Sequence, residues 1–582
     1  MAGFYPARAR VRRREGGRAR ADSEQRAIRG RAHQRPVERP ALRAAALNSA
    51  RVGPGGKPLL PKSGDPRNSA PQVATIGGSG RSAIGGRGVA EVIVIGGGIA
   101  GLGTALALSR SGHRVTVLEK DSTPLPDSAL EAFERWDRRG APQVRHSHAF
   151  LARFRNLLRD RAPDVLDALM RSGAYDLRIT EMLPPTIDDR SAKPGDEDLV
   201  LLGCRRLTLE WVLHKIVVES PGVVWHDGVQ VLGLEAVAGS PPRVTGVRAR
   251  RSGGPVETLR ADVVVDASGR RSALSKWLDQ IGAKPLQEES EDCGIFYSSR
   301  FYRLLPRAEE PPRDGPIGAD LGYMKFAVFS GDSRIFSITL AASPEDTPMR
   351  RVLRPGPFEA AANAIPAIRT WLEPDRSEPV TGVYGMAGLR NRRRVFMRDG
   401  IPLALGVHAI GDAAIHTNPL YGRGCSLAFV HAYLLADAFR EHGDDSEGLA
   451  LELERGTRRE IEPWYRSAVT QDRDACEVAA QQRRGEDPFA MNTTSGGEAV
   501  DPARFMRSVL RDGLLPALRT DAVVMRAFLR NFNLLERPDS LLTNGDVMRR
   551  VLAAWRERDR RAPAEPLGPE RAEMVRVLEQ AA

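Results

Sequence analysis

An apolar strand that runs directly into a glycine turn, a helix and a second apolar strand constrains the fold of this 582-residue chain more than any other feature. The segment covers residues 91–120 and has the spacing G-x-G-x-x-G. In such a βαβ unit the first glycine permits the tight turn, the second lets a pyrophosphate approach the backbone, and the third lets the helix pack close to the strand. The N-terminus of the helix also offers N–H groups to phosphate oxygens, which predicts a dinucleotide site. The predicted contact residues of the turn are Gly96, Gly98, Ile99, Ala100 and Gly101.

An acidic residue ends the second strand of this unit. Glu119 lies 18 residues after the third glycine, with Lys120 beside it. Its carboxylate is placed to accept hydrogen bonds from the ribose hydroxyls of an adenosine and would repel a 2′-phosphate. The sequence therefore favours FAD or NAD over NADP.

The positive charge is concentrated at one end of the chain. The net charge is +12, but residues 1–90 hold 19 Lys or Arg against 5 Asp or Glu, so the other 492 residues are nearly neutral. Residues 1–88 are rich in Arg, Gly, Pro and Ala and show no helical or strand period, which predicts a disordered basic tail. A signal peptide is not expected, because no apolar stretch follows the basic start. A transit peptide and a natural start near Val89 both stay open.

Several other classes of protein do not fit the sequence. No run of about 18 apolar residues occurs, so no transmembrane helix is expected. The four cysteines are far apart and form no C-x-x-C pair, which argues against a disulfide framework or a zinc site and favours the cytoplasm. They are Cys204, Cys293, Cys425 and Cys476.

Two segments distant from the glycine turn carry further nucleotide-binding features. In residues 262–272 an apolar strand ends in Asp266 and continues as a turn of small residues, which would present backbone to a phosphate or ribose. In residues 403–428 a strand delivers Gly411 and Asp412, and a loop rich in proline and glycine opens a largely apolar helix. Asp412 could hold ribityl hydroxyls, and the N-terminus of the helix would direct partial positive charge at an anion.

Together these motifs resemble the class A flavoprotein monooxygenase superfamily, which has the para-hydroxybenzoate hydroxylase fold, and within it the epoxidase and halogenase-like branch. The resemblance covers about residues 90–440. It implies that the glycine turn and Glu119 bind the ADP half of FAD, and that Arg206, in an R-x-x-L-E segment, contacts the flavin side. It also implies that Gly411 and Asp412 bind the ribityl and pyrophosphate, and that an N-P-x-x-G-x-G loop beginning at Asn418 lies along the isoalloxazine. The full set of predicted cofactor-binding residues is Gly96, Gly98, Ile99, Ala100, Gly101, Glu119, Lys120, Arg206, Asp266, Gly411, Asp412, Pro419, Gly422, Gly424 and Cys425.

The resemblance implies a fold class and a domain order. The expected fold is α/β, with a Rossmann-like FAD-binding domain of the glutathione-reductase type, an inserted and mostly antiparallel β-sheet domain for the substrate, and a helical C-terminal region. The strand patterns between Cys293 and Arg394 and the helical patterns after Asp437 agree with this order. The expected domains are the tail 1–88, the FAD-binding domain 89–290 and 395–440, the substrate domain 291–394 and the helical region 441–582.

The implied reaction is monooxygenation in secondary metabolism, in which a flavin C4a-hydroperoxide transfers one oxygen atom to a small apolar alkene or arene. No side chain is required as a nucleophile, and no metal is expected. The segment at Asp266 reads D-A-S-G-R and no second G-x-G-x-x-G follows a strand, so the sequence indicates no dedicated site for a nicotinamide cofactor. NAD(P)H is therefore expected as a transient reductant or through a separate flavin reductase. The W-x-W-x-I-P motif of tryptophan halogenases is absent, which disfavours halogenation.

Two alternative functions stay open. One is an FAD-dependent reductase of isoprenoid double bonds, similar to geranylgeranyl reductase, which has the same motifs but consumes no oxygen. The other is a flavoprotein whose basic tail binds nucleic acid, although the neutral remainder of the chain argues against it. The oligomeric state is left open.

Histidines and arginines near these motifs allow more than one interpretation. His146 and His148 lie in residues 136–148, a stretch similar to the G-x-P-Q-x-x-H-x-H segment of the epoxidase-like branch. A metal site is not expected here, because two ligands without a third bind a metal poorly. Either one histidine forms a hydrogen bond to the flavin edge, or both are ordinary loop residues. Arg206 is favoured as a flavin contact, and the adjacent Arg205 as a surface charge.

Other side chains have a structural interpretation beside the functional one. The four arginines within residues 390–394 predict a solvated turn, and His416 fits either role. Aromatic residues on the expected sheet could line a substrate pocket, but on strands they belong to the core more often. They are Tyr297, Tyr302, Tyr323 and Phe326.

Overall fold

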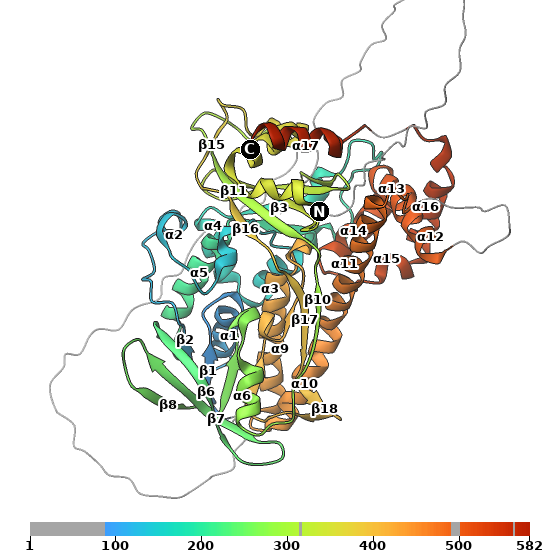
Figure 1. Cartoon of the computed structure of the whole chain (residues 1–582). Helices are drawn as coiled ribbons and strands as arrows, with labels where there is room; N and C mark the ends of the chain where they lie inside the picture. Colours follow the sequence, from blue (N-terminus) through green and yellow to red (C-terminus); the bar gives the residue numbers. More distant parts are fainter. Residues whose placement is uncertain (1–87, 313–316, 490–500, 563–564) are drawn as a thin grey trace, which may run out of the picture. The chain divides into compact units, whose positions relative to one another are not determined.

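The structure, a computed structural model, describes residues 88–312, 317–489, 501–562 and 565–582, and all of these belong to one compact unit (Figure 1). The predicted disordered tail lies outside the described residues except for Gly88. The domain boundaries expected from the sequence stay a prediction.

Five strands form a parallel sheet in the order β20–β9–β1–β2–β5. The central strand β1 is apolar and buried on both faces, which is why Val92 to Ile95 show no polar alternation. Because the strands are parallel, their carboxyl ends lie along one edge, where the loops after them meet. The strands are β1 Glu91–Ile95, β2 Arg114–Leu118, β5 Val223–His226, β9 Val263–Asp266 and β20 Val407–Ala409.

Helix α1 (Ile99–Arg110) packs against α5 (Arg206–Glu219) and α9 (Gly424–His442). The approach to α9 is close, since a Cβ at Gly103 would stand 3.1 Å from the Phe429 ring. The other elements of this region are α2 Ala129–Arg135, α3 Ala152–Arg161, α4 Pro163–Arg171, α6 Leu274–Gln280, the hairpin β3 Tyr175–Arg178 and β4 Val200–Gly203, and the antiparallel strands β6 Val229–Val237, β7 Arg243–Arg251 and β8 Val256–Arg260.

A second, antiparallel sheet of six strands has the order β12–β13–β14–β11–β15, with β16 also paired to β11. Its apolar face packs on α7 (Pro355–Ala364) and on α17 (Arg571–Gln580), whose Met574 and Leu578 are fully buried. Tyr302 and Phe326 lie in this core, so their structural interpretation is the one observed. The strands are β11 Phe296–Leu304, β12 Gly318–Asp320, β13 Met324–Ser330, β14 Ile335–Ala342, β15 Ser377–Pro379 and β16 Tyr384–Met386.

The solvated turn predicted at residues 390–394 is wrong. These residues form strand β17 (Arg390–Val395), which pairs with β10 (Gln287–Asp292) and β21 (Ile415–His416), and β10 and β17 run side by side in Figure 1. Arg393 binds Glu289 and Glu462, and Arg394 binds Glu288. Arg393 and Arg394 are therefore buried partners of an acidic strand, whereas Arg390 at the start of β17 is exposed.

The chain after α9 is helical, as predicted. Asp501 accepts a hydrogen bond from Ala503 N at 3.0 Å and so caps α12, with Pro502 at its first position. None of the helices in the described ranges is long and apolar enough to cross a membrane. The helices between α9 and α17 are α10 Ser446–Glu460, α11 Glu462–Arg483, α12 Pro502–Ser508, α13 Leu515–Thr520, α14 Ala522–Phe532, α15 Ser540–Thr543 and α16 Gly545–Arg556.

Arg205 is not the surface charge that the sequence suggested. Its guanidinium binds Asp332 at 2.6 Å, and the two side chains are 3% and 0% exposed. The same carboxylate accepts from Arg205 N at 2.8 Å and from Thr208 Oγ1 at 2.7 Å. This buried ion pair fastens the start of α5 to the turn between β13 and β14.

Replacing Asp332 by Ala should lower the free energy of unfolding by about 3–5 kcal/mol, because Arg205 would remain buried without its counter-charge. Asp164→Ala is the matched control, since Asp164 pairs with Arg110 at 2.6 Å but is 58% exposed, and it should cost no more than about 1 kcal/mol. Urea unfolding followed by circular dichroism measures both. Equal losses in the two variants would contradict a special role for the buried pair.

Candidate functional site

Three motifs that are far apart in sequence meet at the carboxyl edge of the parallel sheet. A Cβ at Gly96 would stand 2.9 Å from Ala267 O, and one at Gly411 would stand 2.8 Å from the Cβ of Ala100. The glycine turn after β1 therefore contacts both the turn after β9 and the segment after β20. This convergence follows from the parallel order of the strands.

The glycine turn has the geometry that its sequence predicts. Gly96 has φ +101°, a left-handed conformation that favours glycine. A Cβ at Gly101 would stand 1.8 Å from Gly96 O, so only glycine allows this approach of helix and strand. In contrast, a Cβ at Gly98 would meet no described atom within 4 Å, which leaves open space before α1. Within the described ranges no side chain caps α1, and its first turn carries no acidic residue.

Glu119 holds the shape of this turn. Its two carboxylate oxygens accept from Gly97 N at 2.6 Å and from Asp121 N at 2.9 Å, and the residue is 5% exposed. A carboxylate has about four lone-pair directions, so two stay available for ribose hydroxyls. The neighbouring Lys120 is exposed.

Arg206 lies at the centre of a buried polar cluster. Its guanidinium donates to Glu210 Oε1 at 2.7 Å, to His148 Nε2 at 3.0 Å and to Cys425 Sγ at 3.3 Å. His148 also contacts His146 O through Nδ1 at 2.9 Å. Burial and the neighbouring guanidinium hold the pKa of His148 well below its usual value. A neutral His148 with its proton on Nδ1 can therefore accept from Arg206.

Sequence reasoning missed Arg138 and Glu210. Arg138 donates to Gly97 O at 2.7 Å and pairs with Glu210 at 3.3 Å, and both side chains are almost completely buried. Glu210 thus stands between Arg138, which binds the glycine turn, and Arg206. The signal for Glu210 was present, since it is the acid of the R-x-x-L-E segment. Arg138 lies in a polar run, Asp137-Arg138-Arg139, that gives no sign of burial.

The segment at Gly411 leads into a loop that ends at α9. Gly411 N donates to His431 Nδ1 at 3.2 Å, while the Asp412 side chain is 37% exposed and can reach a ligand. Gly422 has φ +66°, and a Cβ on it would stand 3.4 Å from the Cβ of Ala149. At Gly424 a Cβ would meet none of the described atoms within 4 Å, and no described side chain caps α9. A second open helix N-terminus therefore lies beside Arg206.

The 146–148 segment also contacts the antiparallel sheet. His146 Nδ1 lies 3.2 Å from Ser299 Oγ of β11. Ser147 Oγ donates to Ser337 Oγ at 2.7 Å and accepts from Thr339 Oγ1 at 2.8 Å, both on β14. One short segment thus joins Arg206 to two strands of the sheet.

The remaining predicted residues have structural partners. Asp266 is fully buried and accepts from Ser268 N at 2.9 Å and from Ser272 Oγ, so its carboxylate closes its own turn. His416 Nδ1 lies 2.6 Å from Arg390 O, and its Nε2 is 3.9 Å from Asp412. Ile99 is buried and Pro419 is exposed. The structure therefore brings together every predicted motif, but it buries the carboxylate of Asp266 behind the turn.

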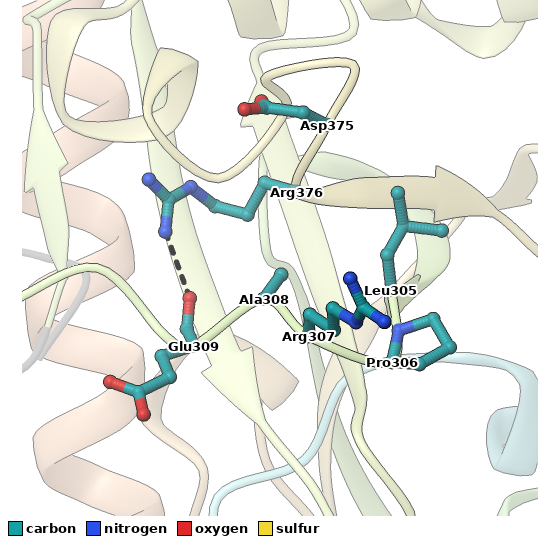
Figure 2. Close-up of a pocket in the computed structure, with 7 residues that line it drawn as sticks. All are labelled: Leu305, Pro306, Arg307, Ala308, Glu309, Asp375 and Arg376. Atoms are coloured by element: carbon teal, nitrogen blue, oxygen red, sulfur yellow. Dashed lines mark hydrogen bonds between the residues drawn. The ribbon is translucent and has the colours of Figure 1, made fainter.

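Two further features lie apart from the predicted residues. One is a cavity of about 540 Å³ that shares no lining residue with the predicted set. At its wall Arg376 donates to Glu309 O at 2.9 Å, and Figure 2 draws the lining residues. Among the described residues, the one trio of acidic or histidine side chains close enough to share a cation is Glu441, His442 and Glu452, which does not include His146 or His148. The cavity is lined by Leu305, Pro306, Arg307, Ala308, Glu309, Asp375 and Arg376.

The arrangement fits a bound dinucleotide. Two open helix N-termini at Gly98 and Gly424 offer N–H groups to anionic parts of a ligand. The carboxylates of Glu119 and Asp412 could accept hydrogen bonds from hydroxyl groups of a ligand, and Arg206 supplies a fixed cation.

Comparisons with known proteins agree with this geometry. Residues 91–438 match the family described as DAO: FAD dependent oxidoreductase. Protein Rv3254 of Mycobacterium tuberculosis (strain ATCC 25618 / H37Rv) is 26% identical in an alignment 513 residues long that covers 81% of this chain and 96% of that protein.

Solved structures show a related fold. The flavin-dependent brominase Bmp2 matches with a TM-score of 0.51 and 15% identity, covering 81% of this chain and all of that one. PqsL, a probable FAD-dependent monooxygenase from Pseudomonas aeruginosa, matches with a TM-score of 0.47 and 18% identity, covering 68% of this chain and 96% of that one. The family match confirms the expected FAD-dependent oxidoreductase family, and the likeness to Bmp2 shows a shared fold. The family match covers more than half of the sequence, so the chain belongs to the DAO family of FAD-dependent oxidoreductases.

Proposed function

We propose that this protein is a flavin-dependent monooxygenase that inserts one oxygen atom into an apolar alkene or arene. The supporting observation is the double contact of the 146–148 segment, which touches Arg206 on one side and the hydroxyls of β11 and β14 on the other. A substrate held against that sheet would lie next to the loop that we assign to the flavin. The sheet within residues 291–394 is accordingly the proposed substrate domain.

The proposed reaction consumes dioxygen and two electrons from NAD(P)H, delivered directly or through a separate reductase. One oxygen atom enters the substrate and the other leaves as water, while the nicotinamide is oxidised. When bound, FAD supplies the electron transfer and the activation of dioxygen.

The protein's own residues would bind the flavin, orient it and stabilise negative charge on it. N–H groups of Gly424 and Cys425 at the start of α9 would stabilise negative charge on the pyrimidine edge of the flavin. Arg206 supplies a second positive charge whose position is fixed by Glu210. Burial raises the pKa of the Cys425 thiol, so it would stay protonated and act only as a hydrogen-bonding neighbour.

We assign contacts with FAD to the motifs that converge at the sheet edge. The glycine turn and Glu119 would bind the ADP half, and Asp412 the ribityl hydroxyls. The segment around Asp266 would contribute through the backbone of its turn. The proposed contact residues are Gly96, Gly98, Ile99, Ala100, Gly101, Glu119, Lys120, Arg206, Asp266, Gly411, Asp412, Pro419, Gly422, Gly424 and Cys425.

Replacing Asp412 by Ala should reduce the FAD retained after desalting to roughly a tenth or less, because hydrogen bonds to a charged group contribute about 1.5–3 kcal/mol each. Asp375→Ala is the control, since Asp375 is exposed in the cavity of Figure 2 and outside the predicted set. Absorbance of the desalted proteins at the flavin bands measures the retained cofactor. A yellow Asp412→Ala protein with the flavin content of the wild type would refute the ribityl assignment.

Oxygen consumption tests the proposed reaction. With NAD(P)H, a flavin reductase and a panel of apolar alkenes and arenes, the holoenzyme should take up oxygen, and a substrate should gain one labelled atom from ¹⁸O₂. Parallel anaerobic incubations with isoprenoid alkenes test the alternative reductase function. Double-bond reduction without oxygen uptake would replace monooxygenation as the function, and a halogenated product in a halide-containing assay would do the same.

A further inference from the structure

Helix α11 lies beyond the residues that match the family, yet it contacts the loop that we assign to the flavin. The match ends at residue 438, and α11 covers Glu462–Arg483. The helix packs against β17 and β21, and the loop of residues 418–423 follows soon after β21. We propose that Asp472 of α11 is a positioning residue that fixes this loop for the flavin. The proposal rests on the assignment of this loop to FAD.

Asp472 is a buried carboxylate surrounded by donors. It accepts from Asn418 Nδ2 at 2.9 Å and from Tyr421 OH at 2.7 Å through one oxygen, and from Asn391 Nδ2 at 2.6 Å through the other. The Cys293 thiol also hydrogen-bonds it. Asp472 is 3% exposed. One side chain of α11 thus binds both ends of the turn 418–421.

The amide groups around Asp472 leave no freedom in this arrangement. Asn391 Oδ1 accepts from Asn418 N at 2.8 Å, so its Nδ2 must face Asp472. Asn418 Oδ1 accepts from Tyr297 OH at 2.6 Å and from Leu420 N at 3.0 Å. In each amide, therefore, the oxygen accepts hydrogen bonds from the loop or the sheet, and the nitrogen donates to Asp472. A side chain with fewer acceptor positions than a carboxylate cannot satisfy all of these donors.

A second residue on the same face of α11 contacts the loop. Trp464 lies two helical turns before Asp472, and its ring stands 4.7 Å from the Arg423 guanidinium, which also lies 4.7 Å from the Tyr421 ring. Arg423 is 4% exposed, and its Nε and Nη1 find no hydrogen-bond partner among the described residues. The aromatic rings and the nearby Asp472 are therefore what stabilises this cation, which directly precedes the open N-terminus of α9.

The protein keeps this carboxylate at an energetic cost. Burial raises the pKa of Asp472 above its ordinary value even though the surrounding donors act in the opposite direction. A raised pKa means that the folded state disfavours the ionised form. A carboxylate that does not stabilise the fold by its charge is better explained by the geometry that it imposes on its neighbours.

The test compares FAD binding by wild type, Asp472→Asn and Asp474→Asn. Asp474 lies on the same helix but points to solvent, where it pairs with Arg507 with its side chain 48% exposed. The Asp472→Asn amide would direct a donor at other donors, so the FAD dissociation constant should rise at least about tenfold. The flavin absorbance bands and midpoint potential should also shift, whereas Asp474→Asn should match the wild type in all of these.

The outcomes separate positioning from a general structural role. If Asp472→Asn lowers the thermal unfolding midpoint but leaves FAD affinity, spectrum and potential unchanged, the proposal is overturned. If Asp472→Asn does not fold, Tyr421→Phe decides, because it removes a single donor and keeps the ring: a shifted spectrum or potential supports the proposal and an unchanged one overturns it. These measurements need neither substrate nor oxygen, so a failure of the monooxygenation assay does not affect them. Should Asp412→Ala retain FAD while Asp472→Asn loses it, the ribityl assignment fails and the positioning role stands.

Discussion

The buried guanidinium of Arg206 is the interaction on which the candidate site depends. A charge in a low-dielectric interior must be paired, and this one is held by Glu210, which also pairs with Arg138, which in turn binds Gly97 O. A continuous series of charges therefore joins the glycine turn to the start of α9. Loss of any member would leave a neighbour buried without its partner, so the turn, helix and loop are constrained together.

Two adjacent arginines have different roles, one in the candidate site and one in holding the fold together. Arg206 faces His148 and Cys425, whereas Arg205 pairs with Asp332 of the antiparallel sheet. The first turn of α5 thus fixes the cation beside the proposed flavin loop, and the preceding residue, Arg205, ties the helix to the sheet that we assign to the substrate. Under that assignment, one short stretch of chain would set the distance between the cofactor and the substrate surface.

Features that depend on residues close together in sequence could be predicted from the sequence alone. The glycine turn was predictable because Gly96 and Gly101 satisfy backbone needs within one βαβ unit. Strand β1 was predictable from its continuous apolar run, and strands of the antiparallel sheet from their sequence pattern. Arg205 and residues 390–394 were interpreted wrongly because their partners, such as Asp332 and Glu288, are about a hundred residues away in sequence. Asp472 was missed for the same reason, because an acid in a polar stretch of a helical pattern looks like a solvated charge, and its donors are distant in sequence.

The position of α17 bears on how the molecule is made. Met574 and Leu578 complete the apolar core beneath the antiparallel sheet, although the strands of that sheet end at Met386. During translation, part of the apolar face of this sheet stays uncovered until these residues leave the ribosome. The parallel sheet shares its core with Ile461, Trp464 and Leu534, which also follow α9, but all of these residues are made before α17. The half of the nascent chain that carries the proposed dinucleotide site can therefore complete its core first, and bound nucleotide would stabilise it while the other half is still assembling.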